Sequence, residues 1–291
     1  MDTGIHRGLS FDDYLGIDAL NWSTLKLMGD SPASMRWHLD NPAPQKSSAA
    51  MQLGTDVHAY LEDPKAFAAT VAVEPADLKG PKAGNGKRSQ WRTAAEAAGL
   101  RVLSSAEWEK VVNMATDEAK KQEGQPKLHP CMRGPGDNEL TLVWTNPFFD
   151  RLCKARIDRV YPGPTGAVVV DTKTTKNAER RAFANDAFRY EYHAQAAWYA
   201  DGWERVTGTA PAASAILAIQ SSPPYSQAFY RLDPDTIESG RRTYSIYLDM
   251  LAKCEASGVW PGYENATIER PKWYSEPQLP HWALSGGATD V

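Results

Sequence analysis

Two acidic residues and a lysine follow two neighbouring apolar segments and could form one polar cluster. Asp158 lies in the first segment, residues 152–161. Asp171 lies at the end of the second, residues 167–172, one residue before its last, and Lys173 follows that segment. A short stretch rich in Pro and Gly separates the segments, and such residues favour the loop of a β-hairpin. Side chains alternate along a strand, so Asp171 and Lys173 project from the same face. We therefore expect the three polar side chains to converge at one end of the hairpin.

The chemistry that suits this cluster is hydrolysis of a phosphodiester. Two adjacent carboxylates provide hard oxygen ligands for Mg²⁺ or Mn²⁺, and a bound cation stabilises charge on a phosphate and lowers the pKa of a bound water. A neighbouring lysine can orient that water or offset negative charge. The simpler alternative is a hairpin whose polar end carries a salt bridge, since Asp-x-Lys is a common pattern. Residues 168–170 have the pattern of a buried strand that ends in Asp171, which favours the functional interpretation.

Length and composition indicate a soluble globular protein with one large domain, or one domain with appendages. The chain has 291 residues, of which 42% are hydrophobic and 23% charged. No apolar run approaches the roughly 18 residues that a membrane span needs, and the N-terminus has no apolar signal core, so we expect a cytoplasmic protein without a membrane partner. Three widely spaced cysteines, Cys131, Cys153 and Cys254, favour reduced thiols and are one short of an iron–sulfur cluster.

The charge balance limits how the chain could bind a polyanion. The net charge is −4 and the pI is near 5.9, so any contact with DNA must use a local basic lining. Residues 79–91 form the most basic segment with the composition of a flexible loop, and it contains Lys79, Lys82, Lys87 and Arg88. This segment is either an ordinary solvated loop or a loop that contacts phosphates and becomes ordered on DNA.

Two elements before the hairpin could bring further polar groups to the cluster. A helix is predicted over residues 49–61, where Gly54 and His58 lie four apart and hence on one side. Such a histidine is either a ligand or an ordinary packed residue, and the glycine favours close packing of the backbone. A strand is predicted over residues 138–144, in which Glu139 is either a third carboxylate of the cluster or a polar strand start.

The remaining periodicities complete a strand–hairpin–helix core. Gln195 and Tyr199 form an i, i+4 pair on a helix predicted over residues 183–206. We further expect a loosely ordered arm over residues 1–20, short helices at 21–28 and 32–39, helices at 91–98, 104–122 and 235–256, strands at 211–220 and 227–231, and a tail from residue 261 with little regular structure. The helix at 104–122 starts with a capping box, Ser104-x-x-Glu107.

Four short motifs in this order resemble those of PD-(D/E)XK nucleases, and most closely the exodeoxyribonuclease VIII group (RecE type), which is related to lambda exonuclease. The resemblance covers roughly residues 20–265, and its motifs are Gly54-x-x-x-His58, Arg156-Ile157-Asp158, Asp171-Thr172-Lys173-Thr174 and Gln195-x-x-x-Tyr199. Two departures are the threonine at position 172, which the group itself allows, and the lack of a proline directly before Asp158. The resemblance implies an α/β (α+β) fold with a restriction-endonuclease-like core, in which helices flank a mixed central sheet.

The family also implies roles for individual residues. Asp158, Asp171 and the carbonyl of Thr172 would bind Mg²⁺ or Mn²⁺, with His58 as a ligand or near-ligand. Lys173 would position the attacking water, and Gln195 would hold the geometry or contact substrate. Glu139 matches only loosely as a catalytic residue. Candidate DNA contacts are Lys79, Lys82, Lys87, Arg88, Arg156 and Tyr199.

The activity implied is a metal-dependent exonuclease that digests double-stranded DNA 5′→3′ from its ends and leaves 3′ single strands for recombination in a phage or prophage setting. Relatives form rings around DNA, so a homo-oligomeric ring and a single-strand annealing protein are the expected partners. The expected domains are an arm with short helices (residues 1–48), the nuclease domain (49–265) and a tail (266–291). The alternatives are a single-strand or structure-specific nuclease of the same superfamily, and a non-catalytic DNA-binding or assembly protein.

Overall fold

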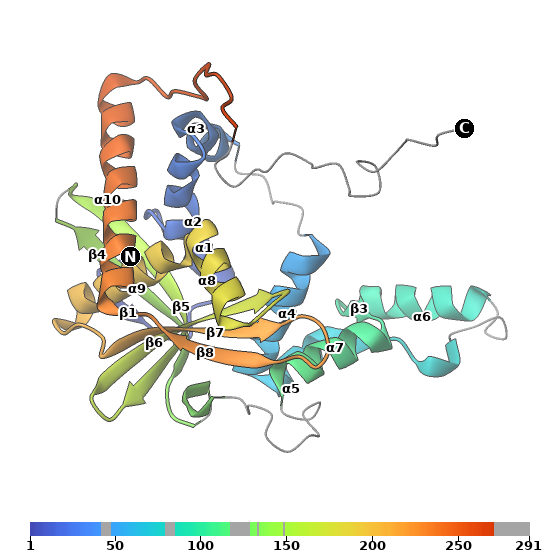
Figure 1. Cartoon of the computed structure of the whole chain (residues 1–291). Helices are drawn as coiled ribbons and strands as arrows, with labels where there is room; N and C mark the ends of the chain where they lie inside the picture. Colours follow the sequence, from blue (N-terminus) through green and yellow to red (C-terminus); the bar gives the residue numbers. More distant parts are fainter. Residues whose placement is uncertain (42–47, 79–84, 117–128, 133, 148, 271–291) are drawn as a thin grey trace, which may run out of the picture.

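A six-stranded mixed sheet forms the centre of the computed structural model, which describes residues 1–41, 48–78, 85–116, 129–132, 134–147 and 149–270 (Figure 1). Only the β6–β7 pair is parallel within this sheet, and the other neighbours are antiparallel. The order across the sheet is β1 (Gly4–His6), β4 (Asp137–Asn146), β5 (Arg151–Gly163), β6 (Gly166–Thr175), β7 (Ala213–Gln220) and β8 (Gln227–Arg231). The predicted mixed sheet and the central hairpin, β5–β6, are confirmed.

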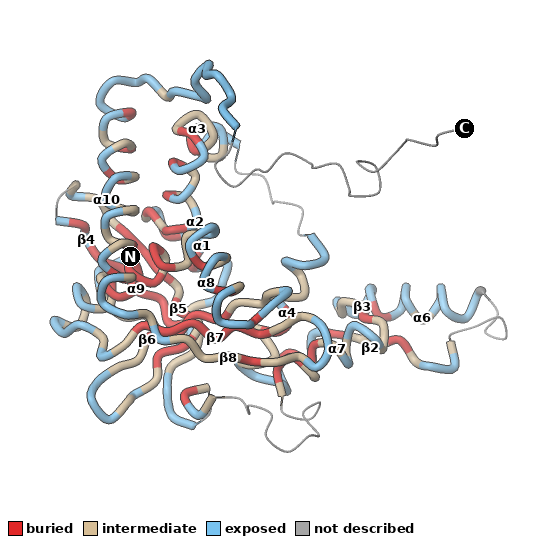
Figure 2. Tube along the Cα trace, viewed as in Figure 1, coloured by how far each residue is buried: buried red, intermediate tan, exposed pale blue. Residues whose placement is uncertain are grey.

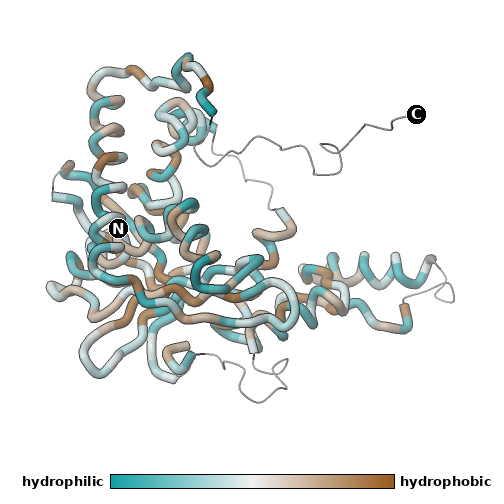
Figure 3. The backbone as a smooth tube through the Cα atoms, in the orientation of Figure 1, coloured by the Kyte–Doolittle hydropathy of each residue, from teal (hydrophilic) through white to brown (hydrophobic). Residues whose placement is uncertain are grey.

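Strand β7 shows why the interior strands are continuously apolar. Its Ile216 and Ala218 pack with α8 (Arg180–Arg189), while Leu217 and Ile219 belong to the core on the opposite face. Helices cover both faces of the sheet, so both sets of side chains are buried. In Figure 2 the buried segments are concentrated in the central strands, and in Figure 3 the most hydrophobic segments lie there as well.

Two pairs of helices enclose the sheet. On one face, α9 (Tyr192–Thr207) and α10 (Pro234–Ser257) pack together so closely that a Cβ added at Gly240 would lie 2.3 Å from the His193 carbonyl oxygen. On the other face, α4 (Ala49–Glu62) packs beside α7 (Ser105–Ala115), with Val57 and Val111 in their shared core. The predicted capping box at the start of α7 is present. The predicted extension of this helix over residues 117–122 lies outside the described residues.

A small arm projects from the main sheet. It consists of the parallel strands β2 (Val71–Val73) and β3 (Arg101–Leu103) and of α6 (Asn85–Ala97), and α5 (Pro64–Thr70) leads into it (Figure 1). Residues 85–91, predicted as part of a flexible loop, are the first half of α6. The two residues with low helix propensity, Asn85 and Gly86, occupy only the first turn, where they disturb a helix least.

The N-terminal residues differ from the predicted loose arm. Strand β1 extends the central sheet by pairing with β4, and α1 (Phe11–Gly16) follows it. The buried ammonium of Lys154 on β5 donates to the carbonyl oxygens of Tyr14 (2.8 Å) and Ile17 (2.7 Å) and thereby holds the C-terminal end of α1. The sheet therefore includes residues from both sides of the domain boundary that the sequence predicts at residue 48.

Short helices connect this N-terminal part to the core, as predicted. They are α2 (Trp22–Leu25), a 3₁₀ turn (Lys26–Gly29) and α3 (Pro32–Asp40). Two further 3₁₀ turns lie at Ala76–Leu78 and Pro130–Met132. Residues 258–270 contain no helix or strand, in agreement with the predicted tail, whose residues 271–291 lie outside the described part. Within the described residues, no helix combines the length and the apolar character that crossing a bilayer would require.

The single helix predicted over residues 183–206 is two helices. Helix α8 ends at Arg189, and α9 begins at Tyr192. Between them Glu191 has a φ of 58°, a left-handed conformation that changes the chain direction without a glycine. The periodic apolar pattern continues across this break, so it gave no indication of the turn.

Candidate active site

The β5–β6 ladder opens at the predicted catalytic residues. Backbone pairs run from Gly163–Gly166 to Arg159–Val170, and Asp158 and Asp171 occupy the next position in register, where no pair forms. The N–H of Thr172 instead donates to the Asp158 carboxylate at 2.7 Å. The two carboxylates therefore lie side by side where the strands separate, as the sequence predicts.

Lys173 is held against Asp171. Its ammonium lies 2.8 Å from Asp171 Oδ2, and both side chains are largely shielded from solvent. Burial lowers the pKa of Lys173, but the carboxylates of Asp171 and Asp158 outweigh that effect, and the pKa is raised above its ordinary value. Lys173 is therefore a cation at neutral pH. Asp171 Oδ1 is buried and has no hydrogen-bond partner in the described part of the chain.

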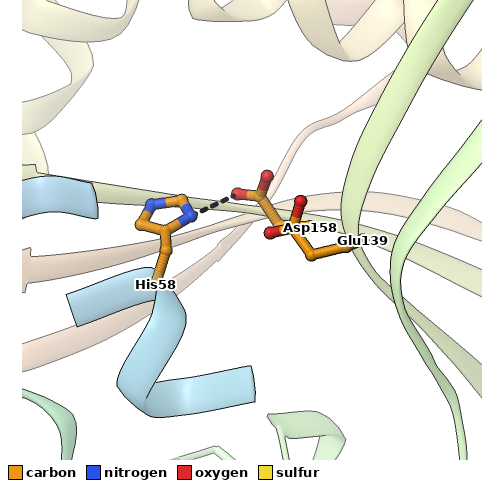
Figure 4. A group of neighbouring side chains, drawn as sticks. All are labelled: His58, Glu139 and Asp158. Carbon is orange, nitrogen blue, oxygen red and sulfur yellow. Dashed lines mark ion pairs between the residues drawn. The ribbon is translucent and has the colours of Figure 1, made fainter. Parts of the chain in front are cut away.

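His58 reaches the same point from α4. Its Nε2 lies 2.9 Å from the Thr172 carbonyl oxygen, and its Nδ1 lies 3.4 Å from Asp158 Oδ2 (Figure 4). A carbonyl only accepts hydrogen bonds, so Nε2 carries the proton, and in the neutral ring the Nδ1 lone pair faces the carboxylate. Gly54, one turn earlier, faces the same strand, and a Cβ added there would make an ordinary contact with Thr174 Oγ1 at 3.4 Å.

Glu139 is the third carboxylate of the cluster. It lies between the paired residues Asn138 and Leu140 on β4, opposite Asp158, and its φ of 47° breaks the regular ladder at this position. Ligand atoms of His58, Glu139 and Asp158 all lie within 4.8 Å of one another (Figure 4). Of the two alternatives for Glu139, the structure supports membership of the cluster over a polar strand start.

Burial and the neighbouring carboxylates raise the proton affinity of Asp158. Burial is the main effect and raises the pKa of Asp158 to about 6, with further contributions from Asp171 and Glu139, while His58 and Lys173 oppose the rise. A carboxyl with this pKa is ionised only in part near pH 6. A divalent cation would remove this penalty.

The residues present fit a hard divalent cation. Carboxylate oxygens, one imidazole nitrogen and a backbone carbonyl are ligands that Mg²⁺ and Mn²⁺ accept. Two features of the structure fit a cation. Asp171 Oδ1 has no partner among the described residues, and ligand atoms of His58, Glu139 and Asp158 lie within 4.8 Å of one another. The predicted ligands Asp158, Asp171, Thr172 and His58 are thus brought together.

Gln195 and Tyr199 form a pair on α9, and the charges of Asp171 and Asp158 act on Tyr199. The Gln195 side-chain amide donates to the Tyr199 hydroxyl at 2.7 Å, as the i, i+4 spacing predicts. Tyr199 is 8% exposed, and burial together with Asp171 and Asp158 raises its pKa well above the ordinary value. A side chain with this little exposed surface offers little area to DNA, so the structure gives no support to the predicted DNA contact of Tyr199.

The other predicted DNA contacts are dispersed. Arg156 is 15% exposed and donates to Glu139 Oε2 at 2.6 Å and to the Leu9 carbonyl, so its guanidinium holds Glu139 rather than facing solvent. Arg88 is exposed on α6 and forms an ion pair with the buried Glu74. Lys87 is exposed on the same helix. Lys79 and Lys82 lie outside the described residues.

Two residues near the site were missing from the sequence prediction. Glu62 lies one turn after His58 on α4 and lines the same small hollow as Glu139 and Asp158, and burial raises its pKa. Its i, i+4 spacing from His58 could have revealed it. The ring of Tyr192 lies under Lys173, with Nζ 4.9 Å from the ring centroid. It follows the unpredicted turn at residue 191, so no sequence signal placed it.

The arrangement is that of the PD-(D/E)XK class: carboxylates on adjacent strands of a mixed sheet, with a lysine two residues after the second carboxylate. Residues 21–272 match the family described as PDDEXK-like domain of unknown function (DUF3799), and the chain belongs to that family. A comparison with curated proteins found no match.

Solved structures provide a further comparison. A crystal structure described as "Putative exonuclease" from Eubacterium rectale is similar to this chain with a TM-score of 0.53 at 12% identity, over 97% of this chain and 100% of that one. This similarity shows a shared fold. A structure described as SSO0001 matches over 77% of this chain and 84% of its own at 12% identity, with a TM-score of 0.25, which carries no argument.

Proposed function

We propose that this protein is a divalent-metal-dependent exodeoxyribonuclease that hydrolyses phosphodiesters from the ends of double-stranded DNA. The observation that carries the proposal is the convergence of Asp158, Asp171, Lys173 and His58 at the point where the β5–β6 ladder opens. A site with unsatisfied carboxylate oxygen and a fixed cation suits a reaction in which negative charge develops on phosphate oxygens. The match to a PDDEXK-like family and the fold shared with the Eubacterium rectale protein agree with this chemistry.

The chain's own residues have distinct roles in this proposal. Asp158, Asp171, the Thr172 carbonyl and His58 would hold Mg²⁺ or Mn²⁺, which stabilises charge on the phosphate and lowers the pKa of a bound water. Because the pKa of Lys173 is raised, this residue acts as a fixed cation that orients the water or the phosphate and not as a base. Glu139, held by Arg156, keeps a third negative charge next to Asp158. Gln195, which donates to Tyr199 on the same helix, would hold the geometry of the site or contact the substrate.

The finer features of the proposal rest on the resemblance described above. They are 5′→3′ polarity, 3′ single-stranded products for recombination, a ring of identical subunits around the duplex and a single-strand annealing protein as partner. A net charge of −4 requires that DNA contacts be confined to local basic groups such as Lys87.

The test uses purified protein with Mg²⁺ on linear duplex labelled at either strand end and on covalently closed circular duplex. Asp171→Ala provides the inactive variant, and Asp249→Ala, an exposed aspartate on α10, is the matched control. We expect loss of 5′-ended strands from linear DNA, an intact circle, an inactive Asp171→Ala and an active Asp249→Ala. Cleavage of the circle would indicate an endonuclease. No loss of either substrate with Mg²⁺ or Mn²⁺ would favour a DNA-binding or assembly protein.

A further inference from the structure

A line of aromatic and cationic side chains leads from Lys173 to the protein surface. The Tyr192 ring lies under the Lys173 ammonium at 4.9 Å, and the Tyr190 ring follows with its centroid 5.8 Å from that of Tyr192. The Arg189 guanidinium lies 5.6 Å from the Tyr190 ring centroid. Tyr190 is 51% exposed, whereas Tyr192 is half-buried. We call Arg189, Tyr190 and Tyr192 the aromatic strip.

The turn between α8 and α9 holds the strip in place. Glu191 adopts its left-handed conformation between the two tyrosines, and its carboxylate accepts a hydrogen bond from the Tyr247 hydroxyl. The Tyr190 N–H donates to the Asp186 carbonyl at 2.8 Å, and the Glu191 N–H donates to the Phe188 carbonyl at 3.2 Å. The rings are therefore presented by a fixed backbone, which reduces the entropy lost when a ligand stacks on them.

The charge around the strip is positive in an otherwise acidic chain. Residues 173–192 contain five basic and three acidic residues, while the whole chain has a net charge of −4. The three acids are Glu179, which caps α8, Asp186, which lies near Tyr192, and Glu191, which accepts the hydrogen bond from Tyr247. Arg189 forms no ion pair within the described residues. Exposed rings beside free cations suit a ligand that carries both flat bases and phosphates.

We infer that the aromatic strip binds unpaired bases of the DNA strand that enters the active site, an inference that rests on the proposed function. Base–aromatic stacking requires an exposed base face. Inside a duplex each face is covered by the neighbouring pair, and a blunt end exposes only the outer face of its last pair, whereas every base of an overhang can present a face. A ring in line with Lys173 therefore selects a strand that is single-stranded or frayed at this point. The strip gives the enzyme a preference for ends with an unpaired overhang over blunt ends.

The first experiment measures binding without hydrolysis. Fluorescence anisotropy in EDTA compares a labelled oligothymidine of about ten nucleotides with an abasic oligonucleotide of the same length, because the second keeps the phosphates and lacks the bases. We expect the wild type to bind oligothymidine more tightly, and Tyr190→Ala to lose roughly five- to hundred-fold of that affinity with little change for the abasic strand. Tyr190→Phe, which keeps the ring, should behave as wild type.

The control is Tyr263→Ala, which removes a tyrosine that is 78% exposed elsewhere on the surface. Arg189→Gln, a second variant on the exposed side of the strip, should weaken both oligonucleotides and reduce the salt dependence of binding. Equal affinity of the wild type for the two oligonucleotides, or an unchanged ratio in Tyr190→Ala, would overturn the inference, including the case in which the strip instead binds a protein.

The second experiment separates this inference from the proposed function. With Mg²⁺, the specificity constant kcat/KM is measured on duplexes with blunt ends and with overhangs. A wild type that hydrolyses both and a Tyr190→Ala that loses only the preference for overhangs support both proposals. If Tyr190→Ala hydrolyses DNA with the same preference for overhangs as the wild type, the aromatic strip does not bind unpaired bases, and the proposed nuclease activity still stands. Absence of hydrolysis in the wild type refutes the proposed nuclease, and the binding experiment in EDTA then still decides whether the strip recognises unpaired bases.

Discussion

Two sets of buried polar side chains on and beside strand β5 differ in whether their hydrogen bonds are made. The satisfied region is Lys154 and Arg159, and the unsatisfied region is Asp158 with its neighbour Asp171 on β6. At Lys154, which is 3% exposed, the ammonium donates to the carbonyls of Tyr14, Leu15 and Ile17, so all its donors are used. Arg159, which is 5% exposed, donates to three backbone carbonyls and to the side chain of Asn138. Four residues after Lys154, Asp158 stands beside Asp171, whose Oδ1 has no partner in the described part of the chain.

The difference separates groups that stabilise the fold from groups that serve chemistry. A buried polar group with all its hydrogen bonds made stabilises one arrangement of the backbone, whereas an unsatisfied one costs free energy. Lys154 and Arg159 attach the N-terminal segment and the residues before β4 to the central sheet. The carboxylates at the opened ladder are held close together despite their repulsion, and a cation is the partner that would satisfy them.

The largest expected effect is a loss of hydrolysis when a carboxylate of the unsatisfied region is neutralised. Asp171→Asn removes one negative charge and should reduce hydrolysis by about 10³-fold or more, since such charge stabilisation is worth several kcal/mol. The variant should stay folded, because relief of the repulsion with Asp158 opposes the loss of the ion pair with Lys173. Hydrolysis rates and thermal melts on the same preparation check this. A variant that is active, or that has lost its fold, would contradict the contrast between the two regions.

A substitution in the satisfied region should reduce the stability of the protein rather than its activity. Lys154→Met leaves three carbonyl oxygens without their donor and should lower the free energy of unfolding by about 2–4 kcal/mol. Hydrolysis per folded molecule should remain at low temperature. Chemical denaturation measures the loss, and Lys253→Met on α10, whose ammonium is exposed, should change stability by less than about 0.5 kcal/mol. If the two substitutions lower the free energy of unfolding equally, Lys154 does not stabilise the fold through its buried hydrogen bonds.

Local signals in the sequence predicted much of the fold and the centre of the site. Alternation and turn residues gave the β5–β6 hairpin, and the spacing of Asp171 and Lys173 placed them together, as the 2.8 Å contact confirms. The Gly54–His58 spacing predicted the close approach of α4 to β6. Each of these depends on residues that are near in sequence or on the fixed two-residue period of a strand.

What depended on contacts between distant segments could not be predicted. Glu139 joins the cluster only because the β4–β5 register sets it opposite Asp158, and two equally plausible roles followed from sequence alone. The pairing of β1 with β4 and the burial of Lys154 likewise require the assembled sheet. The turn at Glu191 violates the usual preference for glycine at positive φ, and strained positions of this kind are common beside functional sites.

A smaller effect should appear when Asp158 itself is neutralised. Its pKa of about 6 in the folded protein exceeds that of an unfolded aspartate, about 3.9, so wild-type stability decreases as pH rises through this window. Asp158→Asn escapes this loss and can still accept the Thr172 N–H. In EDTA at pH 7.5 the variant should be more stable by about 1–3 kcal/mol, and the gap should close below pH 4. A less stable variant at pH 7.5 would show that the carboxylate is not under strain.

The smallest effect is the pH dependence of metal binding, and it joins the two regions in one measurement. Below pH 6 a proton competes with the cation for Asp158, so the Kd for Mn²⁺ measured by calorimetry should rise by up to about tenfold per pH unit in the wild type. Above pH 7 the Kd should be nearly constant. Lys154→Met should show the same slope in conditions where it is folded, because its ammonium lies in the other region. If the pH dependence of the Kd for Mn²⁺ changes in Lys154→Met, then Lys154 also affects the proton affinity of the site. The satisfied and unsatisfied regions would then be energetically coupled.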